Sequence, residues 1–154
     1  MRRWWGGDTV RRWGPVAAWL LVISALSSGW FGGVQTGYFL IPVIRWLFPS
    51  ATWTDLLAAH RLVRKLGHFA EFLVLGVLLY RALDGAGGFR PRIALQALAL
   101  AALCAVADEL HQWFVTGRTA SAWDSLIDTS GAAAGLALLA ARARVFMARV
   151  PARP

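Results

Sequence analysis

The feature that most constrains the fold is an apolar run from Val16 to Val34 that contains no charge. As a helix, this run would match the hydrocarbon core of a bilayer, which is roughly 30 Å thick. Three further apolar segments follow it, at Leu66–Tyr80, Ile93–Phe114 and Ser125–Ala141. Each of these three is long enough to cross only if polar residues at one end are included. Those polar ends are therefore expected to face a shared cavity rather than lipid.

The composition fits a membrane protein, because 58% of the 154 residues are hydrophobic and only 16% are charged. A soluble domain usually carries about 25% charged residues, and a disordered chain has low hydrophobicity. The single cysteine, Cys104, excludes a disulfide scaffold. A net charge of +8 would suit a nucleic-acid binder, but not at this hydrophobicity. We therefore predict an all-α integral membrane bundle of four transmembrane helices, with membrane lipids and no nucleic acid as partners.

Basic residues mark one side of the predicted bundle. With four spans, the tails at 1–15 and 142–154 lie on the same side as the second connection. That side holds most of the basic residues, namely Arg2, Arg3, Arg11, Arg12, Arg81, Arg90, Arg92, Arg142, Arg144, Arg149 and Arg153. Because basic loops stay in the cytoplasm, we expect two basic cytoplasmic tails around a membrane domain at 16–141. The protein is then a multi-pass protein of the inner or plasma membrane.

The first extracytoplasmic connection contains a second apolar segment, Tyr38–Phe48. It is too short to span a bilayer, and Pro42 interrupts it. Its tyrosine and tryptophan are residues that favour the membrane–water interface. We expect an interfacial helix here.

The unusual polar residues collect at the other, outward face. They are Lys65, His68 and Glu71 in the second span, Asp108, Glu109, His111 and Gln112 in the third, Arg118 and Ser121 in the break, and Asp124 and Asp128 in the fourth. A charged side chain at the bilayer centre costs about 2.5–3.5 kcal/mol, so such a set needs a reason.

Helical spacing aims these polar residues at one place, since positions three or four apart share a helical face. The pairs and triplets with that spacing are Lys65 with His68 and Glu71, Asp108 with Gln112, Glu109 with Gln112, and Asp124 with Asp128. Three helices can therefore present polar stripes to one point.

Two functional hypotheses use the cationic and titratable members of this set. In the first, Arg118 and Lys65 bind a phosphate while Ser121 donates a hydrogen bond, because the guanidinium fork suits phosphate. In the second, His68 or His111 performs acid–base chemistry with a carboxylate, which requires a group that titrates near neutral pH.

A third hypothesis is a divalent metal bound by His68, Glu71, Asp108 and His111, whose ligand types suit zinc or manganese. Their spacing matches no strong metal motif. The structural alternative is that the charges pair with one another. The candidate cations are Arg64, Lys65 and Arg118, and the candidate anions are Glu71, Asp108 and Asp124.

These motifs resemble those of the VanZ-like family. Arg64–Phe72 (RKLGHFAEF) is similar to the family's RK-x-x-HF-x-E-Y, and Asp108–Phe114 (DELHQWF) to its DE-x-x-Q-x-F. Gly117–Asp124 (GRTASAWD) resembles its GR-x-x-S-x-x-D, and Asp128–Gly135 continues as D/N-x-x-G-x-x-x-G. Ser27 and Ser28 look like its paired serines. The resemblance covers about Ser27 to Ala141.

The sequence departs from the family pattern at three positions. Thr116 stands where proline is usual, Phe72 where tyrosine is common, and Asp128 where asparagine is often found. The first two changes are conservative in size and are expected to leave the site intact. Phe72 removes any role for a tyrosine hydroxyl.

The resemblance implies a small integral membrane protein linked to reduced susceptibility to teicoplanin and related lipoglycopeptides. It brings no established chemistry, and it leaves the cofactor and any metal unknown. Our hypothesis is an outward-facing polar site that binds or modifies an anionic lipid or a cell-envelope precursor. The expected catalytic residues are His68, Glu71, Asp108, Glu109, Gln112 and Asp124, and the expected substrate-binding residues are Lys65, Arg118, Ser121, His111 and Asp128.

Two rival classes remain. One is a non-enzymatic binder or accessory protein that shields a cell-envelope target, such as a lipid-linked cell-wall precursor or the lipoglycopeptide itself. The other is a lipid transporter or scramblase, which four spans without an inverted repeat disfavour in a monomer. A homo-oligomer is compatible with the sequence.

Overall fold

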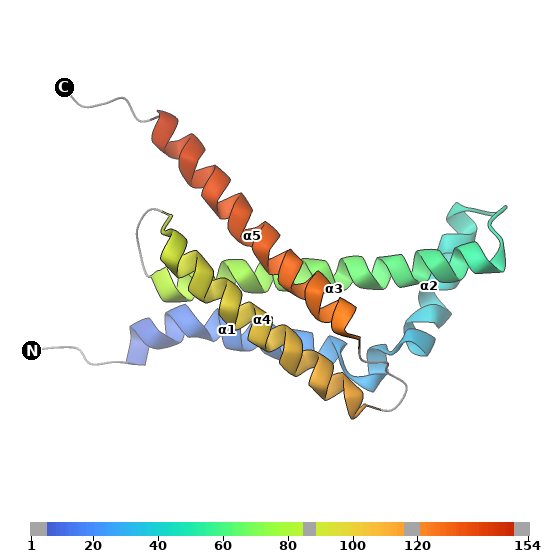
Figure 1. The fold of residues 1–154 in the computed structure, drawn as a ribbon. Helices are drawn as coiled ribbons and strands as arrows, with labels where there is room; N and C mark the ends of the chain where they lie inside the picture. The colour runs from blue at the N-terminus through green and yellow to red at the C-terminus, as the bar shows by residue number, and fades with distance from the viewer. Residues whose placement is uncertain (1–5, 85–88, 116–120, 150–154) are drawn as a thin grey trace, which may run out of the picture.

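The fold is all-α in the part of the chain that the computed structural model describes, residues 6–84, 89–115 and 121–149. The elements in chain order are α1 (Gly6–Leu26), a short 3₁₀ helix η1 (Gly29–Phe31), α2 (Gly33–Leu47), α3 (Trp53–Asp84), α4 (Pro91–Trp113) and α5 (Ala122–Arg149). Figure 1 shows these helices crossing one another in a splayed bundle. The prediction of an all-α membrane bundle is confirmed.

Three helices in the described residues are long and apolar enough to cross a membrane, namely α3, α4 and the Ala122–Phe146 part of α5. Helices α1 and α2 meet that criterion only as a pair, bent by 62° at the break between them. The chain is thus a multi-pass membrane protein with three spans, or four if the bent pair is one span. Many large apolar side chains on these helices are exposed, as lipid-facing surfaces require.

The prediction of one uninterrupted helix from Val16 to Val34 is wrong. Helix α1 already begins at Gly6, so it includes part of the predicted basic tail, and it ends at Leu26. The Ser28 hydroxyl donates to the Ala25 carbonyl at 2.5 Å, and such local bonds compete with helix continuation. The break places Ser27 beside the polar ends of the other helices.

Helix α2 covers most of the segment predicted to lie in the interface, and it continues through Pro42 to Leu47. The next helix, α3, starts with a reciprocal cap. The Thr52 hydroxyl and amide both donate to the Asp55 carboxylate, at 2.6 and 2.9 Å. The Asp55 amide donates back to the Thr52 hydroxyl at 3.3 Å, which completes a capping box.

Glycines set the closest contact in the bundle, which is between α3 and α5. A Cβ atom at Gly131 would overlap the Phe69 carbonyl, and one at Gly135 would overlap the Leu73 carbonyl. Small residues let membrane helices approach to this distance, because association there depends on packing. The spacing of Gly131 and Gly135 therefore serves packing within the bundle.

Alanines on α4 complete the core from a third side. Ala97, Ala101 and Ala105 recur every four residues and are fully buried. They pack in one apolar cluster with Phe72 and Leu75 of α3. This small-residue stripe brings the end of α4 close to the middle of α3 and the start of α5.

The two ends of the bundle differ in chemistry. The start of α1, the end of α3, the start of α4 and the end of α5 lie toward one end (Figure 1). There Arg12 donates to the Ala82 and Leu83 carbonyls at the end of α3, at 2.6 and 3.1 Å. Arg90 pairs with Asp84. The acidic residues of α4 and α5 lie toward the opposite end. Basic and acidic residues that the sequence assigns to different sides are therefore also separated in the structure.

We predict that Gly131→Ala lowers stability despite the higher helix propensity of alanine, which is worth about 1 kcal/mol. The added methyl group must separate α5 from the α3 backbone, and overpacking of this kind costs about 1–3 kcal/mol. The measurement is the thermal unfolding midpoint of the purified protein in detergent. Gly67→Ala is the matched control, because no atom of another helix lies within 4 Å of its Cβ position. An unchanged midpoint for Gly131→Ala would contradict the close contact.

Candidate functional site

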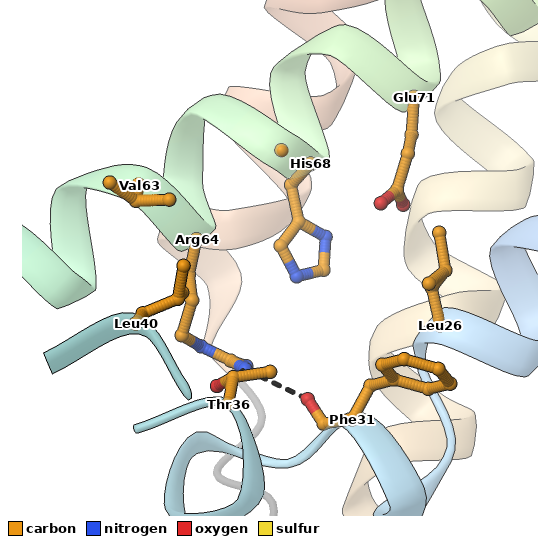
Figure 2. A pocket seen from close by; sticks show the side chains of 9 residues that line it. Leu26, Phe31, Thr36, Leu40, Val63, Arg64, His68 and Glu71 are labelled. Carbon is orange, nitrogen blue, oxygen red and sulfur yellow. Dashed lines mark hydrogen bonds between the residues drawn. The ribbon is translucent and has the colours of Figure 1, made fainter. Parts of the chain in front are cut away.

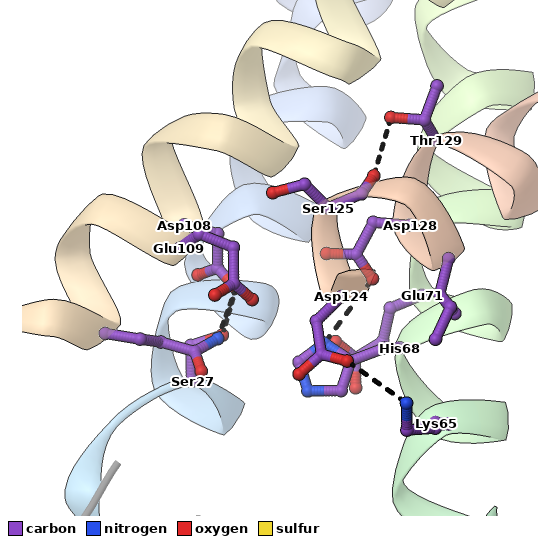
Figure 3. Close-up of polar contacts among 12 residues, drawn as sticks. Ser27, Lys65, His68, Glu71, Asp108, Glu109, Asp124, Ser125, Asp128 and Thr129 are labelled. Atoms are coloured by element: carbon purple, nitrogen blue, oxygen red, sulfur yellow. Dashed lines mark hydrogen bonds and ion pairs between the residues drawn. The ribbon is translucent and has the colours of Figure 1, made fainter. Parts of the chain in front are cut away.

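The candidate site is a polar cluster where α3, α4 and α5 meet the break after α1. We define the polar cluster as Ser27, Lys65, His68, Asp108, Glu109, Gln112, Asp124 and Asp128, most of which are drawn in Figure 3. Several of these side chains are almost fully removed from solvent, namely Ser27, Asp108, Glu109, Gln112 and Asp128. Burial of this many polar groups is costly unless they contact one another.

His68 and Asp128 form the centre of the cluster. His68 Nδ1 lies 3.5 Å from Asp128 Oδ1, with side-chain exposures of 15% and 0%. The glycine contact explains this placement, since Gly131 lies against Phe69 and so turns Asp128 of the preceding helical turn toward His68. The pair therefore follows directly from the close packing of α5 on α3.

Asp108 is held by two donors on one oxygen. The Ser27 hydroxyl and the Gln112 side-chain amide each donate to Asp108 Oδ2 at 2.8 Å. The bond from Gln112 confirms that positions four apart on α4 share a face. The bond from Ser27 joins the end of α1 to α4, and it depends on the break that ends α1 nearby.

The remaining acidic groups of the cluster contact α3 and the start of α5. Lys65 Nζ lies 3.6 Å from Asp124 Oδ1, at a more exposed position. An exposed ion pair of this kind contributes little stability. The Ser121 amide donates to Glu109 Oε2 at 2.6 Å, which ties the start of α5 to α4. The Ser121 hydroxyl accepts from the Trp123 amide at 3.3 Å, so Ser121 acts here as a helix cap.

A cavity of about 180 Å³ opens beside the cluster, between α2, α3 and the break after α1. Its apolar lining is Leu26, Phe31, Leu40 and Val63, and its polar lining is Thr36, Arg64, His68 and Glu71. Figure 2 shows the His68 ring and the Glu71 carboxylate projecting from α3 into this space. His68 thus belongs to both the cluster and the cavity.

Arg64 is fixed at the cavity wall. Its Nη1 donates to the Phe31 carbonyl at 2.9 Å and to the Thr36 hydroxyl at 3.2 Å. The Thr36 hydroxyl also lies 3.0 Å from Nε2 of the buried His60. This network connects α2 and η1 to α3 and holds a cation against an otherwise largely apolar space.

Most of the residues predicted from the sequence are brought together. Lys65, His68, Asp108, Glu109, Gln112, Asp124 and Asp128 lie in the cluster, while Glu71 lines the cavity. His111 is exposed on α4, away from the buried face of the cluster. Arg118 lies outside the described residues. The sequence-based site set omitted Ser27, although the paired serines pointed to it. It also treated Arg64 as a counter-charge only.

Three ligand atoms from three helices are close enough to suggest a metal centre. His68, Asp108 and Asp128 each offer one ligand atom, and these atoms lie within 4.8 Å of one another. The set predicted from the sequence, with Glu71 and His111, is not the one that assembles in the described residues. Asp128 takes the place that His111 was expected to fill.

The sequence profile of the family described as VanZ/LLP1 matches residues 16–145. The chain belongs to the VanZ/LLP1 family. The match runs from within α1 almost to the end of α5, so it includes the whole polar cluster and the cavity. It confirms the resemblance seen in the motifs. No curated protein and no solved structure gives a significant match to this VanZ/LLP1 chain.

We predict that Ser27→Ala destabilises the protein by about 1–3 kcal/mol, because it removes a donor from the buried Asp108 carboxylate. Ser24→Ala, an exposed position in the last turn of α1, is the matched control. Thermal unfolding of both variants in detergent measures the difference. Equal midpoints for the two variants would show that the bond from Ser27 to Asp108 contributes nothing to stability.

Proposed function

We propose that this protein binds the anionic headgroup of a membrane lipid, or of a lipid-linked cell-envelope precursor, in the cavity beside the polar cluster. The observation that carries the proposal is the position of Arg64, a half-buried cation in a cavity that it shares with His68 and Glu71 and whose remaining walls are largely apolar. A lipid phosphate would suit such a cavity, because its negative charge can pair with Arg64 while its hydrocarbon chains contact the apolar walls.

The geometry of Arg64 suits such a ligand. A guanidinium has five N–H donors, and its contacts with Phe31 and Thr36 both use Nη1. Those two contacts orient the group before a ligand arrives, which lowers the entropy cost of binding. His68 lies on the same wall and presents its ring to the cavity. The role first given to Arg118 thus has a described counterpart in Arg64.

The charge distribution supports an outward-facing cavity. Arg12 and Arg90 lie at the end of the bundle where α1 begins and α3 ends, and the cavity is at the other end. The positive-inside rule then assigns both termini to the cytoplasm and the cavity to the outer face of the membrane. There it would meet lipid-linked envelope material, which supports the proposed link to lipoglycopeptide and teicoplanin susceptibility.

A second candidate function is acid–base chemistry on the bound lipid. The observation that favours it is the pairing of His68 Nδ1 with the buried Asp128, which would orient the ring while Nε2 serves as the acid or base. Binding alone and chemistry differ in one respect, since only chemistry changes the covalent structure of the lipid.

We predict that Arg64→Gln weakens binding of phosphatidylglycerol and of a long-chain isoprenyl phosphate by about tenfold or more. The loss of a charge-assisted hydrogen bond is worth about 1.5–3 kcal/mol, and 1.4 kcal/mol is tenfold in affinity. Native mass spectrometry of the detergent-solubilised protein measures both ligands. Mass analysis of the recovered lipids then separates binding from turnover.

Arg61→Gln is the matched control, because Arg61 is exposed on the same helix one turn earlier and does not line the cavity. It has the same charge and length and removes the same formal charge from the protein. Equal affinity for the two variants, or equal affinity for phosphatidylcholine and phosphatidylglycerol in the unsubstituted protein, would contradict the proposed function.

A further inference from the structure

We propose that His68, Asp108 and Asp128 bind a divalent transition-metal ion such as Mn²⁺ or Zn²⁺. Their ligand atoms come from α3, α4 and α5 and lie within 4.8 Å of one another. Two ligands of a tetrahedral ion, each about 2.1 Å from it, are about 3.4 Å apart. The three side chains would therefore close on the ion when it binds.

The burial of the Asp128 carboxylate is the observation that favours a bound cation. Its side chain is 0% exposed, and neither of its carboxylate oxygens receives a hydrogen bond within the described residues. A buried carboxylate without such donors carries a large desolvation cost. Its described partner is His68 at 3.5 Å, a long distance for a direct hydrogen bond. An ion between the two side chains would accept both as ligands.

The charges around Asp128 also favour a bound cation. Asp108 is buried beside it, and Asp124 and Glu109 lie in the same cluster. Of the cations on the facing side of α3, Lys65 pairs with Asp124, and the Arg64 guanidinium contacts Phe31 and Thr36. One histidine cannot balance two buried carboxylates, whereas a divalent ion can.

The surroundings of Asp108 resemble those of a metal ligand. Ser27 and Gln112 both donate to Oδ2, and these two bonds hold the carboxylate in place. Metal-binding carboxylates are held by such outer hydrogen bonds. A donor set of one imidazole and two carboxylates suits manganese, zinc or iron, whereas calcium and magnesium favour all-oxygen sites.

The ion would occupy the position between His68 Nδ1 and Asp128, so it excludes the acid–base pairing described above as the second candidate. It does not depend on lipid binding in the cavity. The two proposals fail separately, because Arg64→Gln is expected to lose lipid and keep the ion, whereas Asp128→Asn is expected to lose the ion.

The experiment uses the full chain in detergent, treated with chelator and then equilibrated with Mn²⁺ or Zn²⁺. We expect stoichiometric metal after gel filtration, measured by elemental mass spectrometry, and a higher thermal unfolding midpoint with metal than without, since a ligand of the folded state stabilises it. Asp128→Asn and His68→Gln are expected to reduce bound metal at least tenfold. Asp8→Asn, which removes an exposed carboxylate on α1 outside the polar cluster, is the control and is expected to retain it.

Failure of the unsubstituted protein to bind either ion stoichiometrically would overturn the proposal. Retention of metal by both Asp128→Asn and His68→Gln would also overturn it. If Asp128→Asn does not fold, His68→Gln together with the Mn²⁺ electron paramagnetic resonance spectrum decides. Histidine nitrogen coupling in the Mn²⁺ complex supports the assignment, and its absence contradicts it.

Discussion

The structure depends on the close approach of α5 to α3, where Gly131 and Gly135 lie directly against carbonyl groups of the α3 backbone. In a membrane, such packing replaces the hydrophobic effect as a source of helix association. This contact fixes the rotation of α5, and that rotation places Asp128 opposite His68. The polar cluster is thus a consequence of the same residues that hold the bundle together.

Much of the site was predictable because helical spacing is a local property. Residues three or four apart on one apolar helix must share a face, and this rule alone grouped Asp108 with Gln112 and aligned Lys65 with His68. The charge distribution likewise predicted which helix ends lie together. In contrast, the break after Leu26 was not predicted. It coincides with a local bond of Ser28 to the Ala25 carbonyl, and the absence of charge between Val16 and Val34 gave no sign of it.

The residues that sequence reasoning missed are those whose role depends on contacts between distant segments. Ser27 reaches Asp108 across 81 positions of the chain, and Arg64 contacts Phe31 across 33. His111 shows the reverse error, because its sequence neighbours Asp108 and Gln112 are buried while its own side chain is exposed. Whether a residue of α4 is buried or exposed depends on which side of the helix it lies on, and therefore on which helices pack against α4.

The central claim is that the polar residues of α3 and α5 meet inside the membrane domain, and cysteine cross-linking tests it most directly. In a Cys104→Ala background, His68→Cys combined with Asp128→Cys is predicted to cross-link in membranes with a short thiol-specific bifunctional reagent, because the native side chains meet at 3.5 Å. The control pair, His68→Cys with Leu138→Cys, should not, because ten further residues of helix add about 15 Å. Absence of the cross-link for the first pair, or equal cross-linking of both pairs, would contradict the account.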